Sequence, residues 1–322
     1  MEKYGHGIDN LVLAGGVALN CVANGKLLKQ QIFKDIWIQP AAGDAGGALG
    51  AALYAYYMYY AMVRNVMSND SQKGSYLGPE YSENEIAKYL SVKRYPYHSF
   101  ENMQELYNMI ATELDKKKVI GLFHGRMEYG PRALGNRSII ADARSEEMQS
   151  KLNLKIKHRE SFRPFAPSVL AERLTDYFEL EKESPYMLLV DQVKKENQIP
   201  YNLEENLNEE DDLLKAVNKK RSNIPAVTHV DYSARIQTVT KEKNSYYYNV
   251  LKAFEKKTGC GVIVNTSFNV RGEPIVCTPQ EAYACFMRTD MDVLVLQNVM
   301  LYKEEQPYFA EKGNWQEKYE LD

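Results

Sequence analysis

Arginine side chains are concentrated in one stretch of the sequence, residues 125–168. These 44 residues hold nine basic and five acidic side chains, whereas the chain of 322 residues has a formal net charge of −3. Gly130, Pro131 and Gly135 interrupt regular structure within the stretch. The planar guanidinium group of arginine matches phosphate or carboxylate in a two-point contact. An ordinary run of charged residues forms a solvated basic face. Arginines held on turns of this kind instead favour a binding site for a polyanionic small molecule.

The motifs around these arginines resemble a known family. EYGPRALGNRSIIAD and the following IKHRESFRPFAPS look like the C-terminal domain of the O-carbamoyltransferases that modify nodulation factors and antibiotics. Three further blocks agree, in the family's order: LAGGVALN near the start, PAVTHVDYSARIQTV at 225–239 and NTSFNVRGEPIV at 265–276. The resemblance implies an α/β (α+β) fold, with the remnant of an actin/hsp70-like Kae1-type domain followed by a YrdC/Sua5-like domain.

The family resemblance also implies an activity. The YrdC-like domain uses carbamoyl phosphate and ATP, with Mg²⁺ accompanying ATP, to form carbamoyl adenylate, and the Kae1-like domain transfers the carbamoyl group to a hydroxyl acceptor. The two substrates together bring about six negative charges, which require several fixed cations. The expected catalytic side chains are Arg132, Arg137, Lys157, Arg159 and Arg163. The expected substrate-binding residues in the same domain are Arg235, Asn265, Thr266, Ser267 and Arg271.

The glycine-rich turns near the N-terminus acquire a role only through the resemblance. By family match, Gly15, Gly16 and Asn20 contact a nucleotide and Asp44 is a metal ligand, although glycines and a lone aspartate ordinarily mark tight turns. The family's metal site also needs an HxxxH motif, and no two of the five histidines here lie four residues apart. We therefore expect Fe²⁺ or another divalent metal at this site only if a partner completes it.

Several functional alternatives remain open from the sequence. The chain could be an active carbamoyltransferase that needs an N-terminal partner, a non-catalytic subunit that binds carbamoyl phosphate or nucleotide, or an inactive fragment. We expect adenylation without transfer for the chain alone. His229 could act as a general acid or base, but a structural role beside Asp231 is the stronger interpretation. Glu128 is expected to orient Arg132, and His124 to be structural.

The elements that must position these residues follow from periodicity. Strand, Gly turn, helix, strand, Gly turn and helix succeed one another over the first 63 residues, which is typical of an α/β layer. The sequence SENEIAKYL carries a capping box with Ser82 and Glu85. We expect three parts: residues 1–68 as the Kae1-like remnant, 69–100 as a connector and 101–322 as the YrdC-like domain. The acidic segment 194–222 is expected to be a surface insertion, with a short helix at 210–219.

Composition narrows the class of protein further. The near-neutral charge gives no reason to expect nucleic acid as a partner. The four cysteines form no zinc pattern and no signal peptide is visible, so we expect a cytoplasmic protein. The uncharged run 47–63 is too short for a membrane span and holds five tyrosines, which favours a buried core helix. A partial first domain leaves a sheet edge uncovered, which predicts a homo-oligomer or association with an N-terminal Kae1-like chain.

Overall fold

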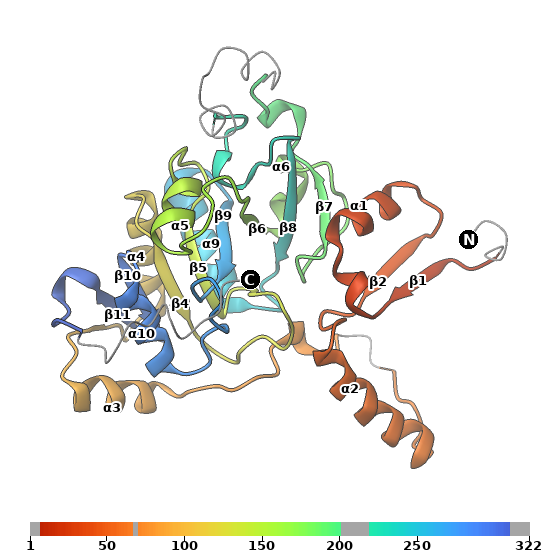
Figure 1. Ribbon diagram of the computed structural model, residues 1–322, viewed down its shortest axis with the longest axis horizontal. Coiled ribbons are helices and arrows are strands. Elements are labelled where there is room, and N and C mark those ends of the chain that lie inside the picture. Colours follow the sequence, from red (N-terminus) through yellow and green to blue (C-terminus); the bar gives the residue numbers. More distant parts are fainter. Residues whose placement is uncertain (1–6, 67–69, 201–218, 310–322) are drawn as a thin grey trace.

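The structure, a computed structural model, describes residues 7–66, 70–200 and 219–309. In this part of the chain the strands form two sheets (Figure 1). A small parallel sheet pairs β1 (Asn10–Leu13) with β2 (Asp35–Ile38), and the other sheet is large and mixed. The α/β class predicted from the sequence is therefore confirmed.

Within the described residues the large sheet has nine strands. In spatial order they are β3 (His98–Ser99), β11 (Val299–Tyr302), β10 (Val293–Leu296), β4 (Ile120–Phe123), β5 (Arg137–Asp142), β9 (Val262–Ser267), β6 (Ala166–Leu170), β8 (Ser233–Val239) and β7 (Leu189–Gln192). Of these, β4, β5, β6 and β10 are buried along their whole length. Strand β9 runs antiparallel to both of its neighbours, β5 and β6. Its C-terminal end therefore lies beside the N-terminal ends of those two strands.

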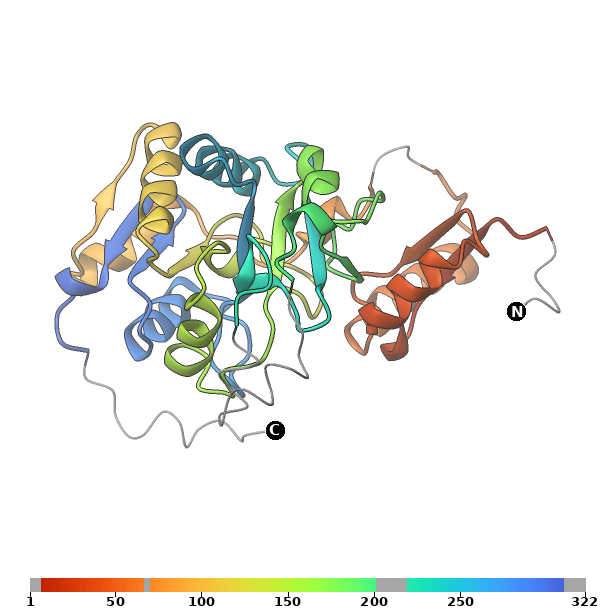
Figure 2. The same ribbon diagram turned by 90° about the horizontal axis from the view of Figure 1, so that it is seen from above.

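Helices cover both faces of the large sheet, which explains why its strands are apolar on both sides. Figure 2 shows α4 and α9 on one face and α5 and α10 on the other. The helices that surround this sheet are α3 (Glu83–Lys93), α4 (Met103–Asp115), α5 (Met148–Lys155), α6 (Leu174–Tyr177), α9 (Ser245–Thr258) and α10 (Pro279–Arg288). The predicted capping box of Ser82 and Glu85 is present at the start of α3. Thr278 caps α10, and Pro279 occupies its first position, where proline is favoured.

The N-terminal segment packs on the edge of the large sheet through α1 (Cys21–Lys29). Asn24 Nδ2 donates hydrogen bonds to the carbonyls of Ala18, at 2.8 Å, and Leu188, at 3.1 Å. Lys29 forms an ion pair with the buried carboxylate of Asp191 on β7. These contacts fix α1 beside β7 and place its first turn above the end of the sheet.

The apolar run 47–63 was expected to be a buried core helix, and this prediction is wrong for the part of the chain described. The run forms α2 (Ala45–Tyr54) and a following π-helical turn (Ala55–Tyr59), neither of which contains a buried residue. Tyr54 and Met58 are each 68% exposed. The helix projects away from both sheets (Figure 1), so no described element covers its apolar face. No helix among the described residues combines the length and the hydropathy needed to cross a membrane.

Two further predictions remain untested. Most of the helix expected at 210–219 lies outside the described residues. The expected connector, residues 69–100, contains α3 and also β3, which pairs with β11 at the edge of the large sheet. The division into residues 1–68, 69–100 and 101–322 remains a prediction.

Candidate functional site

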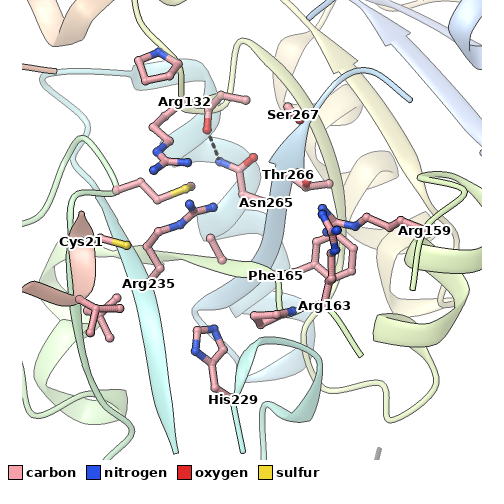
Figure 3. A pocket seen from close by; sticks show the side chains of 17 residues that line it. Cys21, Arg132, Arg159, Arg163, Phe165, His229, Arg235, Asn265, Thr266 and Ser267 are labelled. Atoms are coloured by element: carbon pink, nitrogen blue, oxygen red, sulfur yellow. Dashed lines mark hydrogen bonds between the residues drawn. The ribbon is translucent and has the colours of Figure 1, made fainter. Parts of the chain in front are cut away.

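A cavity of about 430 Å³ lies where α1 meets the end of the large sheet. Figure 3 shows four arginine side chains around it, together with the side chains at the end of β9. Arg132 comes from the loop before β5, Arg159 and Arg163 from the loop between α5 and β6, and Arg235 from β8 itself. The fold thus gathers into one cavity arginines that are separated by up to about a hundred residues in sequence.

Among the residues that the structure describes, no aspartate or glutamate lines the cavity. Burial, together with the positive charges of Arg132 and Arg159, lowers the pKa of Arg235 to about 10. Burial also lowers the pKa of Arg159 to about 10, with Arg163 as an additional repulsive neighbour. The guanidinium groups therefore repel one another at neutral pH. A bound polyanion would remove this repulsion and accept their hydrogen bonds.

The loop that carries Arg132 is held by the buried carboxylate of Glu128. Glu128 Oε1 accepts hydrogen bonds from the backbone N–H groups of Leu134, at 2.6 Å, and Asn136, at 2.8 Å. Burial raises the pKa of Glu128, while these hydrogen bonds act in the opposite direction. Arg132 Nε is buried and has no partner among the described residues. Glu128 thus fixes the backbone that follows Arg132, and its expected role in orienting the Arg132 side chain stays a prediction.

The end of β9 supplies the other polar groups of the cavity. Asn265, Thr266 and Ser267 all line it, and Asn265 Nδ2 donates a hydrogen bond of 3.2 Å to the carbonyl of Ala133. This contact joins the end of β9 to the loop that bears Arg132. The arginines and the β9 terminus therefore form one connected site.

Arg137, expected in the anion site, lies elsewhere. Its side chain is 0% exposed, and its guanidinium group packs 3.6 Å from the centre of the Phe123 ring. Arg137 Nη1 donates to the carbonyl of His124, at 2.8 Å, and Nη2 donates to that of Pro79, at 3.1 Å. Arg137 does not line the cavity. Its position gives it a structural role that the motif alone did not reveal.

Lys157 is also set back from the cavity. Its buried Nζ lies 2.9 Å from the carbonyl oxygen of Asn269, 2.8 Å from Asn269 Oδ1 and 3.2 Å from Ser267 Oγ. Burial lowers the pKa of Lys157 to about 7, whereas the surrounding oxygen atoms favour the ammonium form. Lys157 therefore fixes the turn after β9. Arg271 lies in that turn, 3.7 Å from Glu160, whose carboxylate also pairs with Arg163 at 2.8 Å.

The N-terminal residues expected to bind a nucleotide do not line the cavity. Gly15 and Gly16 are exposed, and Asn20 caps α1 by accepting a hydrogen bond of 3.1 Å from the backbone of Ala23. The next residue, Cys21, does line the cavity, as does Val22. The sequence analysis missed Cys21, although its place directly after LAGGVALN could have indicated it.

Asp44, the expected metal ligand, is exposed at the start of α2. Within residues 7–66, 70–200 and 219–309, no group of three or more His, Cys, Asp or Glu side chains is arranged to hold a metal ion. The residues present around Asp44 therefore do not fit a divalent metal held by protein ligands alone.

His229 lines the cavity opposite the arginine loop. Its Nδ1 lies 3.1 Å from Ser233 Oγ. Burial lowers the pKa of His229 to about 4; the carboxylate of Asp231 opposes this shift, whereas the positive charges of Arg235 and Arg221 add to it. The imidazole is therefore neutral at physiological pH.

Comparison with known proteins assigns relatives to both parts of the chain. The sequence model of the family described as carbamoyltransferase C-terminus matches residues 111–303, and that described as carbamoyltransferase N-terminus matches residues 2–53. The uncharacterised protein sll1178 of Synechocystis is 57% identical over 98% of this chain and 51% of its own length. The nodulation protein NolNO of Sinorhizobium fredii is 39% identical over 92% of this chain and 40% of its own length. This chain thus spans about half the length of the curated relatives it matches, or less.

Among solved structures, HypF in its phosphate- and nucleotide-bound form is similar over 60% of this chain and 25% of its own, with 17% identity and a TM-score of 0.39.

Proposed function

Since the chain belongs to the carbamoyltransferase family, we propose that its arginine-lined cavity binds carbamoyl phosphate and ATP and forms carbamoyl adenylate. The observation that carries the proposal is the set of four cavity arginines, with no acidic side chain beside them in the lining as far as the chain is described. A site of this charge suits two phosphate-bearing substrates whose own repulsion must be overcome. Mg²⁺ would enter with ATP as its counter-ion.

In the proposed reaction, carbamoyl phosphate and water give carbamate and phosphate. A carbamate oxygen then attacks the α-phosphorus of ATP, forming the mixed anhydride and releasing pyrophosphate. Arg132, Arg159, Arg163 and Arg235 would hold the phosphoryl oxygens and stabilise the charge that develops on them. Thr266 lies near the end of β9, where its hydroxyl group can orient the same oxygens, whereas the hydroxyl group of Ser267 beside it donates to Asn269 Oδ1 at 2.6 Å.

The acceptor of the carbamoyl group is expected to carry a hydroxyl, as the family resemblance implies. We propose that transfer to this acceptor requires a first domain completed by a partner chain of the N-terminal, Kae1-like type, or by a second copy. The exposure of the apolar helix α2 supports this part of the proposal, because such a face is normally covered by protein.

A pyrophosphate-release assay tests the adenylation step directly. The protein is incubated with ATP, Mg²⁺ and carbamoyl phosphate, and pyrophosphate is measured against a reaction lacking carbamoyl phosphate. We expect release that depends on both substrates and that is strongly reduced in Arg163→Ala. Absence of turnover, combined with absence of binding of either substrate by calorimetry, would refute the proposal.

A further inference from the structure

A chain of buried polar side chains crosses the large sheet and ends at the cavity. Tyr247 on α9 donates a hydrogen bond of 2.9 Å to Ser168 Oγ on β6. Ser168 Oγ in turn donates to Gln237 Oε1 on β8, at 2.5 Å, and Asn265 Nδ2 on β9 donates to the same Gln237 oxygen, at 2.7 Å. Three neighbouring strands and a helix thus cooperate to hold one side chain, that of Asn265.

These contacts determine which way the Asn265 amide faces. Gln237 Nε2 donates a hydrogen bond of 2.9 Å to the carbonyl of Leu134, so Gln237 Oε1 must be the atom that accepts from Asn265. The second hydrogen of Asn265 Nδ2 goes to the carbonyl of Ala133. Both hydrogens of Asn265 Nδ2 are therefore donated to oxygen atoms, which can only accept. This fixes the orientation of the amide, and Asn265 Oδ1 faces away from these two acceptors.

Asn265 Oδ1 has no hydrogen-bond partner among the described residues, although Asn265 is only 1% exposed. Leaving a buried carbonyl oxygen unpaired is unfavourable, and such a group is an exception that calls for a ligand or another explanation. Figure 3 shows its amide group between Arg132 and Arg235 on one side and Arg159 and Arg163 on the other. Guanidinium groups can only donate, so Asn265 Oδ1 is an amide acceptor placed among donors.

We propose that Asn265 Oδ1 accepts a hydrogen bond from the amino group of the carbamoyl moiety and thereby selects carbamoyl donors against acyl donors. This inference rests on the proposed function of the cavity. The arginines recognise phosphoryl oxygens, which carbamoyl phosphate shares with acetyl phosphate. The amino group is the part of the molecule that differs, because acetyl phosphate carries a methyl group there and cannot donate. A site built to accept a hydrogen bond rejects an analogue that lacks the donor.

Gln237 and Ser168 act in this scheme as positioning residues, since neither belongs to the cavity lining. Gln237 holds the amide of Asn265 and the arginine-bearing loop at the same time, through Asn265 Nδ2 and the Leu134 carbonyl. Ser168 fixes Gln237. Loss of the Ser168 hydroxyl should loosen the Asn265 amide without removing its oxygen.

The test begins with the unmodified protein. Its dissociation constants for carbamoyl phosphate, acetyl phosphate and inorganic phosphate are measured by calorimetry in the same buffer. We expect carbamoyl phosphate to bind about ten- to a hundredfold more tightly than acetyl phosphate. Equal affinity for these two ligands, with inorganic phosphate still bound, would overturn the selection role while leaving the anion site intact. Failure to bind any of the three would count against the proposed function itself.

Variants then assign the preference to one side chain. Asn265→Ala should bind carbamoyl phosphate and acetyl phosphate with nearly equal affinity and retain most of its affinity for inorganic phosphate. Ser168→Ala should reduce the preference only in part. Asn298→Ala, which removes an asparagine from the turn between β10 and β11, should leave it unchanged. A full preference retained in a folded Asn265→Ala variant, verified by thermal unfolding, would contradict the proposal.

Discussion

Gly25 of α1 lies against the backbone carbonyl of Val190 on β7, so closely that a Cβ atom at position 25 would sit 2.0 Å from that oxygen. The contact lies one helical turn after Cys21 and Val22, which line the cavity. Val190 lines it as well and pairs with Arg235 in the sheet. The close approach of Gly25 to Val190 therefore fixes how the N-terminal segment closes the arginine site.

Gly25→Ala should separate α1 from β7, because a backbone carbonyl cannot yield as a flexible side chain can. We expect a loss of about 1–3 kcal/mol in the free energy of unfolding, the range for overpacking at a tight contact. Urea unfolding monitored by circular dichroism measures it. Gly47→Ala in α2 is the matched control, since nothing lies within 4 Å of a Cβ there. That substitution should be neutral or stabilising by up to about 1 kcal/mol, and equal effects at the two positions would contradict the packing argument.

The arginines of the motif should separate into two classes when each is replaced by alanine. Arg163→Ala should weaken the binding of carbamoyl phosphate or ATP by roughly 1–3 kcal/mol and leave stability nearly unchanged, because Arg163 lines the cavity and is exposed. Calorimetry for affinity and thermal unfolding for stability check this expectation. Unchanged affinity for both ligands in a folded Arg163→Ala protein would be the opposite result.

Arg137→Ala should instead lower stability, by about 2–4 kcal/mol, because buried carbonyls would lose their donors and Phe123 would lose its packing partner. Ligand affinity measured well below the lowered melting temperature should change less than in Arg163→Ala. A stable Arg137→Ala protein with lost ligand binding would restore the role first expected for Arg137.

The sequence allowed the main elements to be predicted because their local signals agree with the tertiary structure. Helix α10, for example, begins after its Thr278 cap, has Pro279 at its first position and buries its apolar face. Which arginines line the cavity and which are structural could not be predicted in the same way. Arg132 and Arg137 are five residues apart in one motif, yet the turn between them sends one into the cavity and the other onto backbone carbonyls. That difference depends on the carbonyl of Pro79 and the ring of Phe123, which contact the Arg137 side chain. Neither residue belongs to the motif.

The exposure of α2 could not be predicted for a different reason. Its composition is that of a buried helix. Composition indicates that such a helix packs against other apolar groups, but not whether those groups belong to the same chain. Asn265 likewise was assigned to substrate binding through the motif, but the direction of its amide depends on Gln237 and Ser168, which no local pattern connects to it.

His229 should make stability depend on pH in a predictable direction. Its pKa is about 4 in the folded protein, chiefly through burial, against 6.5 for an ordinary histidine. Between these values the unfolded chain binds a proton that the folded protein does not, so the free energy of unfolding falls as pH decreases from about 6.5 to about 4. The total effect is at most about 3 kcal/mol.

Replacement of the imidazole isolates this contribution from that of other titrating groups. His229→Gln should flatten the pH dependence of urea unfolding across pH 4 to 6.5 relative to the unmodified protein. The two proteins should differ by a constant amount above pH 7.5, where histidine no longer titrates in either state. Parallel curves through the whole range would show that His229 gains its proton in the folded protein as readily as in the unfolded chain.

The apolar face of α2 should mediate association. Tyr54 and Met58 lie one helical turn apart, are each 68% exposed, and belong to a helical segment, Ala45–Tyr59, that contains no buried residue. Water in contact with such a face is unfavourable, so we expect the protein to self-associate with increasing concentration, or to bind a chain carrying the rest of the family's N-terminal region. Light scattering across a concentration series should show growth in mass that the double variant Tyr54→Ser and Met58→Ser abolishes.

Val92→Ser, which removes a side chain 73% exposed on α3, is the control for a general gain in solubility and should leave the association unchanged. A monomer at all concentrations that also fails to bind an N-terminal family chain would refute the assignment of α2 as an interface.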